Sequence, residues 1–268
     1  MEMPILPQRI ICLTEESAEL LYLLGEQDRI VGVSAFAVRP EGIKKRHPVV
    51  SVFTHAQQDK IKDLKPDLII GYSDIQKDIA RELIEKGHNV WIANHRSLQE
   101  VTNYCFSLSS LVGAQESFLK ILNQWQKKIL KAQEFAKKLT LTKGKLKVYI
   151  EEWDDPRISG IEYFSELVEL CGLVDINRHL RTGFLAKERF PDEEYIIKKS
   201  PDLIFGCWCG KKVDIKSIKE RKNWQEVSAI ENDKVFELPP EIFLQPGAAL
   251  FEEGIDYLIN LLEQEILK

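Results

Sequence analysis

The chain has 268 residues, of which 44% are hydrophobic and 29% are charged, the ordinary composition of a globular protein. Its net charge of −5 argues against nucleic acid as the main partner, because binding to phosphates requires a clustered basic surface. No apolar run approaches the roughly 18 residues that a membrane span requires, so no span is expected.

The N-terminal sequence and the cysteines bear on where the protein works. Residues 1–7 lack the basic region and the apolar core of a secretory signal. The cysteines are odd in number and scattered, which forms no disulfide framework and suits a reducing compartment. They are Cys12, Cys105, Cys171, Cys207 and Cys209. We therefore expect a cytoplasmic protein as the sequence is written, or a periplasmic or lipid-anchored one if a leader was removed.

Short apolar runs alternate with helical patterns up to residue 112. Residues 9–13 predict a strand, and Thr14 with two following glutamates, an apolar run and Gly25 predicts a helix with a polar cap. Further strands are predicted at 29–34, 48–53, 67–71 and 89–93, and further helices at 59–64, 75–86 and 97–111. This alternation implies a mostly parallel sheet that is covered on both faces.

The segment between Gly113 and Gly144 predicts one long helix. It contains neither Pro nor Gly, and its apolar residues recur mostly at helical spacing. These are Phe118, Ile121, Leu122, Trp125, Ile129, Leu130, Phe135 and Leu139. A helix of about 25 residues is about 38 Å long, which exceeds the usual length in globular proteins. The apolar repeat is too short and irregular for a coiled-coil arm.

Two similar sequences, residues 64–73 and 199–208, stand on either side of this helix. Each contains a helix end, a Pro-Asp pair, a short apolar strand, and then Gly and an aromatic residue. The repeat indicates two similar lobes joined by a rigid helix. Beyond it, strands are predicted at 146–150, 203–205 and 234–238, and helices at 165–170, 193–199, 215–221 and 248–267.

These patterns predict an α/β protein with two Rossmann-like lobes, each with a mostly parallel sheet. The N-terminal lobe is expected at 1–112, the bridging helix at 113–143 and the C-terminal lobe at 144–268, with a ligand cleft between the lobes. Ligands of such sheets bind beyond the carboxyl ends of the strands.

Aromatic residues follow the predicted strand ends of both lobes. They are Phe36, Phe53 and Tyr72 in the first lobe, and Trp153, Trp208 and Phe243 in the second. Aromatic rings give a large flat contact area and lose little entropy, which suits a bulky planar ligand. Packing in the core is the alternative for each ring.

An acidic run follows the first strand of the second lobe. Its members are Glu151, Glu152, Asp154 and Asp155. Neighbouring carboxylates repel one another unless something neutralises them. Arg157 in the same predicted loop is one candidate, and contacts with ligand amides or a hard cation are others.

Motifs of common catalysts are absent from the sequence, including the nucleophile elbow, the Walker loop, the dinucleotide fingerprint and the His-Glu-x-x-His motif. The histidines are too dispersed for a zinc site. His55 and His95 nevertheless fall at predicted strand ends of one lobe, so a metal site with carboxylates stays open. Cys207 and Cys209 are expected on one face of a strand end, where they could bind metal or oxidise.

With these features the chain resembles the helical-backbone solute-binding proteins of ABC importers, and most closely their cobalamin-binding members. The resemblance covers nearly the whole chain. The segments that carry it are residues 49–53, 59–70, 165–172, 200–204 and 245–247. It implies a monomeric protein that binds a ligand without chemical change and has no built-in cofactor and no metal. The long helix has no obvious hinge, so only a small closure is expected on binding.

The resemblance also implies roles for individual residues. Phe53 falls where the family commonly has a cleft tryptophan, and Tyr72 falls at a second aromatic position. Trp153 and Trp208 stand on ligand-facing loops, and Glu241 falls near an acidic residue that contacts corrin amides. Asp59, which is shorter than the usual glutamate, and Glu194 match the acidic residues that pair with permease arginines.

The sequence therefore predicts capture of a corrinoid, a ligand like vitamin B12, for ABC-type import or handling. The expected ligand contacts are Phe36, Phe53, Tyr72, Glu152, Trp153, Asp154, Trp208, Glu241 and Phe243. One alternative is a ferric siderophore or haem, for which Lys211, Lys212 and Arg157 are the obvious cations. A second alternative is a metal site or enzyme built on His55, His95 and carboxylates.

Overall fold

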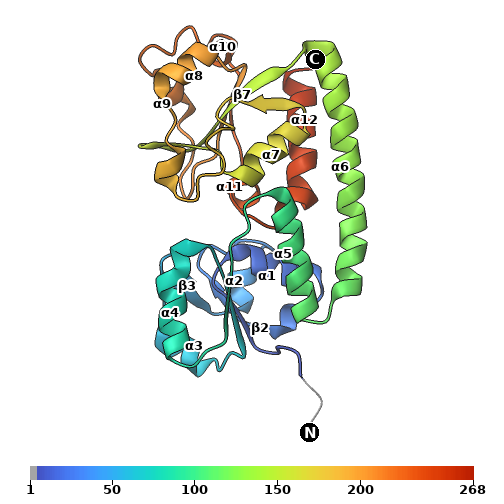
Figure 1. The fold of residues 1–268 in the computed structure, drawn as a ribbon, viewed down its shortest axis with the longest axis vertical. Coiled ribbons are helices and arrows are strands. Elements are labelled where there is room, and N and C mark those ends of the chain that lie inside the picture. The colour runs from blue at the N-terminus through green and yellow to red at the C-terminus, as the bar shows by residue number, and fades with distance from the viewer. Residues whose placement is uncertain (1–4) are drawn as a thin grey trace. The chain divides into compact units, whose positions relative to one another are not determined.

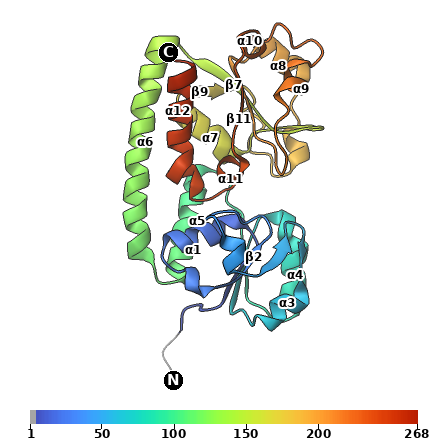
Figure 2. The same ribbon diagram turned by 180° about the vertical axis from the view of Figure 1, so that it is seen from behind.

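The computed structural model describes residues 5–268, and its ribbon is drawn from opposite sides in Figures 1 and 2. The chain divides into two compact units. Unit 1 contains the described residues up to His95 together with Gln99–Asn123, and unit 2 contains Arg96–Leu98 together with Gln124–Lys268. Each unit has one mostly parallel sheet. The fold class predicted from the sequence is confirmed.

Unit 1 is built on a six-stranded sheet in the order β4-β3-β2-β1-β5-β6. Its strands are β1 (Ile10–Cys12), β2 (Ile30–Ser34), β3 (Val49–Val52), β4 (His55–Ala56), β5 (Leu68–Tyr72) and β6 (Val90–Ala93). The helices are α1 (Glu15–Leu23), α2 (Ile43–Arg46), α3 (Gln58–Asp63), α4 (Lys77–Glu85) and α5 (Leu98–Leu111), with short 3-10 turns at Gln27–Arg29 and Asp74–Gln76. Only β4 runs antiparallel to its neighbour.

Unit 2 is built on a five-stranded sheet in the order β11-β10-β7-β8, with β9 also paired to β7. Its strands are β7 (Leu146–Asp154), β8 (Arg157–Ser159), β9 (Leu173–Asp175), β10 (Leu203–Gly206) and β11 (Val235–Glu237). Its helices are α7 (Glu162–Leu170), α8 (Glu193–Lys199), α9 (Ile215–Lys219), α10 (Ser228–Glu231), α11 (Pro240–Phe243) and α12 (Ile255–Glu265). A 3-10 turn spans Ala186–Arg189 and a π-helix spans Leu250–Gly254.

The repeated Pro-Asp sequence has the same role in both sheets. The carboxylate of Asp67 accepts a hydrogen bond of 2.9 Å from the backbone N–H of Arg9, which leads into β1. In unit 2 the carboxylate of Asp202 accepts one of 2.7 Å from the backbone N–H of Lys147 at the start of β7. Each aspartate also donates its own N–H back to the same residue. The repeat therefore fixes the start of a central strand pair in each unit.

The long helix α6 spans Gln115–Lys143, as its sequence predicts. Its later part belongs to unit 2, where Figures 1 and 2 both show it beside α12. The Trp125 ring stacks on Phe251 with 4.6 Å between centroids. Lys128 and Lys131 form ion pairs with Asp256 of α12, at 3.1 and 2.7 Å. Burial and charge pairing together hold the two helices in one register.

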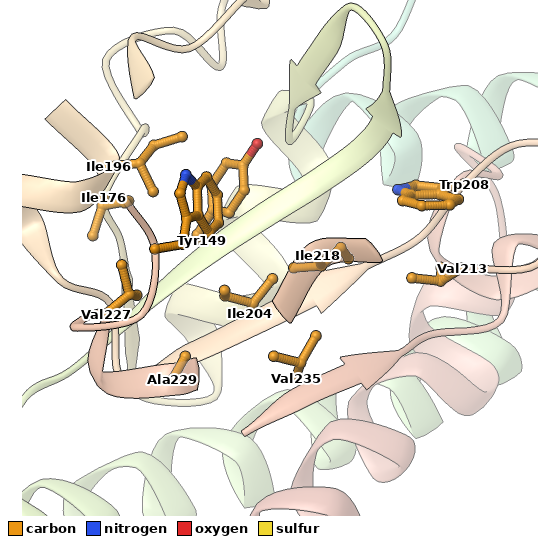
Figure 3. Close-up of a cluster of buried hydrophobic side chains, with 11 residues drawn as sticks. Tyr149, Ile176, Ile196, Ile204, Trp208, Val213, Ile218, Val227, Ala229 and Val235 are labelled. Carbon is orange, nitrogen blue, oxygen red and sulfur yellow. The ribbon is translucent and has the colours of Figure 1, made fainter. Parts of the chain in front are cut away.

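A cluster of buried apolar side chains fills one face of the unit 2 sheet. It joins Tyr149, Ile204 and Val235 of three adjacent strands to Ile218 of α9, as Figure 3 shows. Trp208 and Val213 lie at one end of this cluster. Trp208 is only 2% exposed, so the core of unit 2 extends to the segment that follows β10.

The structure differs from the sequence prediction mainly at short edge strands. The strand predicted at 146–150 continues to Asp154 and turns back into β8, so the acidic run forms a hairpin and not a loop. Strands β4 and β9 were missed because a strand of two or three residues carries no periodicity of its own. The terminal helix predicted at 248–267 is divided into a π-helix and α12.

The helix α6 offers a matched test of this packing. Leu139 is fully buried and Leu141, two positions later, is 88% exposed. We expect Leu139→Ala to lower the free energy of unfolding by about 2–5 kcal/mol, because it opens a cavity. Leu141→Ala is expected to change it by less than about 0.5 kcal/mol. Urea unfolding of both variants measures the difference, and equal costs would contradict this packing of α6.

Candidate functional site

The carboxyl end of the unit 1 sheet is held together by the side chain of Gln76. Its amide oxygen accepts a hydrogen bond of 3.0 Å from the backbone N–H of Tyr72. Its amide nitrogen donates one of 3.1 Å to the carbonyl oxygen of Phe53. A Cβ at Gly71 would lie 2.4 Å from this amide oxygen, so only glycine leaves room for it. The strand ends that carry Phe53 and Tyr72 are therefore linked by a buried side chain.

The three aromatic residues predicted for unit 1 differ in exposure. Phe36, which follows β2, is 44% exposed, and Phe53 is half-buried. Tyr72 is only 7% exposed. Its hydroxyl donates a hydrogen bond of 3.0 Å to the carbonyl oxygen of His95, and its ring lies 4.9 Å from the His95 ring. Phe36 and Phe53 thus offer accessible ring surface, whereas Tyr72 offers very little.

The metal site suggested for His55 and His95 is wrong for a topological reason. His55 lies in β4 and His95 follows β6, and these strands form opposite edges of the six-stranded sheet. At about 4.8 Å per strand the edges are about 24 Å apart. Among residues 5–268, no group of three or more His, Cys, Asp or Glu side chains could hold a metal ion.

A buried acidic group at the start of α1 was not foreseen from the sequence. Glu16 is 1% exposed, and burial together with the charge of Glu15 raises its pKa from 4.5 to about 8. Glu19, also buried, forms an ion pair of 2.9 Å with Arg39. The sequence predicts Glu15 and Glu16 as ordinary first-turn residues of a helix, and nothing in the local sequence indicates the burial of Glu16 or Glu19.

In unit 2 a buried carboxylate organises the carboxyl end of the sheet. Glu151 of β7 is fully buried. It accepts two hydrogen bonds from the guanidinium of Arg221, at 2.6 and 2.8 Å. It also accepts one of 3.2 Å from the indole N–H of Trp208 and one of 3.0 Å from the hydroxyl of Tyr149. Because burial of a charge is costly unless it is paired, this arrangement strongly favours one position for Trp208.

Trp153 and Trp208, called here the tryptophan pair, both lie near one lysine. The Trp153 indole N–H donates a hydrogen bond of 2.9 Å to the carbonyl oxygen of Asp155. The Lys211 ammonium lies 4.2 Å from the Trp153 ring centroid and 4.8 Å from that of Trp208. It also forms an ion pair of 2.6 Å with Asp154. Burial acts to raise the pKa of Asp154, but the hydrogen bond and charge of Lys211, together with backbone hydrogen bonds, outweigh burial and lower that pKa.

Three of the four carboxylates in the acidic run pair with cations from distant segments, and none of these cations is Arg157, which was one candidate from the sequence. Arg221 pairs with Glu151, and Lys211 pairs with Asp154. Arg189 pairs with Glu152 at 2.6 Å, and Glu152 also accepts a backbone hydrogen bond from Ile161. The carboxylate of Glu152 is therefore engaged within the fold, which argues against its predicted ligand contact.

Arg157 and Lys212 were the other cations considered for an anionic ligand. Arg157 pairs with Glu193 at 2.9 Å and lies over the Trp224 ring, with 6.0 Å to its centroid. Lys212 is exposed. Of the three cations only Lys211 lies against the tryptophan pair.

The structure argues against Phe243 as one of the predicted ligand contacts. Its side chain is fully buried, and its ring stacks on Phe164 with 5.3 Å between centroids. It meets Tyr257 edge-on at 5.5 Å. Phe243 therefore belongs to the core, and its position after a strand end does not make it a ligand contact. Glu241, two residues earlier on α11, is exposed.

The residues predicted to contact a permease are both accessible. Asp59 is exposed in the first turn of α3, and Glu194 is exposed in the first turn of α8. The two cysteines expected on one face do not share an environment. Cys207 is buried, which raises its pKa well above the usual value, while Cys209 is exposed. Strand β10 ends at Gly206, so strand alternation does not apply to them.

Comparison with known proteins decides the family. The model of a family described as periplasmic binding protein matches residues 10–242. The chain belongs to this family. The family predicted from the sequence is confirmed. None of the helices among residues 5–268 is long and apolar enough to cross a membrane.

Two relatives cover most of this periplasmic binding protein. An uncharacterized ABC transporter substrate-binding lipoprotein, YvrC of Bacillus subtilis, is 25% identical over 98% of this chain and 82% of its own length. A vitamin B12-binding protein of Vibrio vulnificus is 23% identical over 81% of this chain and 81% of its own. Both names describe solute-binding proteins and not enzymes, and the chain is a substrate-binding protein of the ABC-import type.

Solved structures share the fold at low identity. The vitamin B12-binding protein BtuF of Vibrio cholerae has a TM-score of 0.74 at 21% identity, over 99% of this chain and 100% of its own. The haem-binding protein RhuT from Roseiflexus gives 0.78 at 16%, over 96% and 98%. The petrobactin-binding protein YclQ of Bacillus subtilis gives 0.79 at 18%, over 97% and 94%. At such identity the likeness shows the fold alone.

The buried Glu16 predicts a pH dependence of stability. Its carboxyl binds a proton more tightly in the folded than in the unfolded protein, since its pKa rises from 4.5 to about 8 on folding. Its contribution to stability is therefore complete below the unfolded pKa and is lost as pH rises through the folded pKa. We expect Glu16→Gln to raise the melting temperature above about pH 7 and to flatten its dependence between about pH 5 and 8.

The matched control for this variant is Glu116→Gln, which changes an exposed glutamate in the first turn of α6. We expect it to leave the pH profile unchanged. Thermal melts across the pH range measure both variants. Parallel profiles for Glu16→Gln and the unchanged protein would show that Glu16 is not buried in solution.

Proposed function

We propose that this periplasmic binding protein captures a flat macrocycle of the corrinoid class and delivers it to an ABC permease. The proposed contacts are Phe36 and Phe53 in unit 1, and Trp153, Asp154 and Glu241 in unit 2. Trp208 is proposed as the buried support of Trp153. Asp59 and Glu194 are the proposed permease contacts, because both are exposed acidic residues in the first turn of a helix. The protein performs no chemistry on its ligand in this proposal.

The observation that carries the proposal is the half-buried Trp153 ring at the carboxyl end of the unit 2 sheet, which packs against a core that contains Trp208. Each indole N–H has a hydrogen-bond acceptor within the fold, Glu151 for Trp208 and the Asp155 carbonyl for Trp153. The rings are thus oriented before a ligand arrives. Rigid aromatic surface of this kind suits a large planar ligand, since little side-chain entropy remains to be lost on binding.

A corrinoid is favoured over haem by the state of the candidate iron ligands. Haem iron is held by an axial His, Tyr, Cys or Met side chain. At the unit 1 strand ends, Tyr72 and His95 are both buried and packed against each other. A corrinoid that carries its own axial base needs no such ligand from the protein, so the protein need supply only ring surface and hydrogen bonds.

An anionic siderophore is disfavoured by the charges beside the tryptophan pair. Arg221 and Arg189 are engaged by buried or half-buried glutamates, and Arg157 by Glu193. Asp155 and Glu241 are exposed carboxylates of the same unit, while Lys212 is exposed next to Lys211. A ligand with several carboxylates would meet more negative than available positive charge here, whereas neutral amides would be tolerated.

We further propose that the protein works outside the cytoplasm, as the names of its relatives indicate for them. The cytoplasmic expectation rested on the lack of a visible secretory signal and on the odd number of scattered cysteines. Four of these are buried in the fold, and only Cys209 is exposed. Buried thiols are shielded from oxidation, so the cysteines carry little information about the compartment.

The first test is a titration of the purified protein with cobinamide and cobalamin, followed by tryptophan quenching and calorimetry. We expect binding with a Kd of about 1 μM or tighter for at least one of them. Phe36→Ala is expected to weaken binding by about tenfold or more, because it removes an aromatic contact. Trp153→Ala is expected to weaken it at least as much.

The matched control is Phe106→Ala, since Phe106 is 46% exposed and Phe36 is 44% exposed. Phe106 lies on α5 beside Leu68, at the start of β5 and away from the carboxyl strand ends. We expect this control to bind as the unchanged protein does. If neither corrinoid binds with a Kd below about 100 μM, the proposed ligand is wrong, and haem and ferric siderophores would be titrated next.

A further inference from the structure

Lys211 occupies the space in front of the tryptophan pair. Its ammonium lies 4.2 Å from the Trp153 ring centroid and 4.8 Å from the Trp208 ring centroid. At these distances a cation is attracted to the negative face of an aromatic ring. The side chain of Lys211 is 40% exposed. The half-buried Trp153 ring, which would stack on a planar ligand, is therefore covered in part by a side chain of the protein itself, while Trp208 packs in the core.

Asp154 holds Lys211 in this position. Its carboxylate lies 2.6 Å from the ammonium and is 27% exposed. Two other charged residues belong to the same region. Arg221 donates two hydrogen bonds to Glu151, and Asp155 is exposed to solvent. Because partly exposed ion pairs contribute little to stability, the pair between Asp154 and Lys211 can separate when a ligand offers replacement partners.

We propose that Lys211 is a removable cover of the ligand site, and that Asp154 and Lys211 separate to bind a primary carboxamide of the ligand. This inference rests on the proposed function. When the pair opens, Lys211 presents a hydrogen-bond donor and Asp154 presents an acceptor. A primary carboxamide carries the complementary groups, a carbonyl oxygen that accepts and an NH₂ group that donates. One amide can thus satisfy both members of the broken ion pair.

A carboxylate in the same place satisfies only one of them. It accepts from Lys211 but has no proton to give to Asp154, and its negative charge is repelled by that carboxylate. The pair therefore selects macrocycles whose side groups are amides over those whose side groups are acids. Tryptophan rings alone would not select amides over acids, because they contact only the macrocycle and not its side groups.

The test compares two corrins that differ in their side groups, cobinamide with amides and cobyrinic acid with carboxylates. We expect the unchanged protein to bind cobinamide at least tenfold more tightly. Asp154→Asn is expected to reduce this preference about tenfold, mainly by strengthening the binding of cobyrinic acid. Calorimetry at fixed ionic strength measures both affinities, and an unchanged preference in Asp154→Asn would overturn the selection of amides.

The cover itself is tested with Lys211→Met, with Lys212→Met as the control. Lys212 is the next residue and is exposed, so the two variants lose the same charge. We expect Lys211→Met to bind cobinamide several-fold faster in stopped-flow tryptophan quenching. Without ligand, it is expected to let acrylamide quench the tryptophan fluorescence more strongly. Lys212→Met should match the unchanged protein in both measurements.

The outcomes separate this inference from the proposed function. Binding of both corrins by every variant, with no change in association rate or in acrylamide quenching for Lys211→Met, overturns the cover and leaves the corrinoid proposal standing. Absence of binding of either corrin by the unchanged protein overturns the proposed function and the amide selection with it. In that case the acrylamide measurement still reports whether Lys211 covers the rings.

Discussion

The candidate site of unit 2 depends on the buried ion pair between Glu151 and Arg221. Glu151 is fully buried and receives four hydrogen bonds, from Arg221, Trp208 and Tyr149. Removing one partner from such a group leaves an uncompensated buried charge, which costs more than the pair contributes. The arrangement therefore gives this end of the sheet a single low-energy geometry. A site whose aromatic surfaces are fixed in this way needs little reorganisation on binding.

In each sheet, hydrogen bonds fix the start of a central strand as well as its carboxyl end. Asp67 and Asp202 each fix the start of the neighbouring central strand through a carboxylate and a backbone hydrogen bond. The residues before the prolines, Lys65 and Ser200, both have positive φ, 47° and 42°, a conformation that non-glycine residues rarely adopt. Equal strain at equivalent positions indicates that the repeat is structural.

The sequence was sufficient for the fold because its signals were local and strong. The apolar spacing of α6 and the Pro-Asp repeat fall where the structure has a 29-residue helix and two central strands. It was insufficient for the site because side-chain pairing is a tertiary property. Arg221 lies 70 residues from Glu151, and no local pattern connects them. The sequence predicts Phe243 and Trp153 alike as residues that follow strand ends, but Trp153 lies within β7, and Phe243 is buried against Phe164.

Ion pairs with residues from distant segments determine which carboxylates of the acidic hairpin can contact a ligand. In the sequence, Glu151, Glu152 and Asp154 are one negative run. In the fold each carboxylate pairs with its own cation from a different segment, and the three pairs differ in how far they are exposed to solvent. Arg221 and Arg189 are enclosed with their glutamates, whereas Lys211 and Asp154 stay in contact with solvent. Only this last pair can exchange partners at low cost, so the ability to recognise a polar ligand group is concentrated there, directly against the two tryptophan rings.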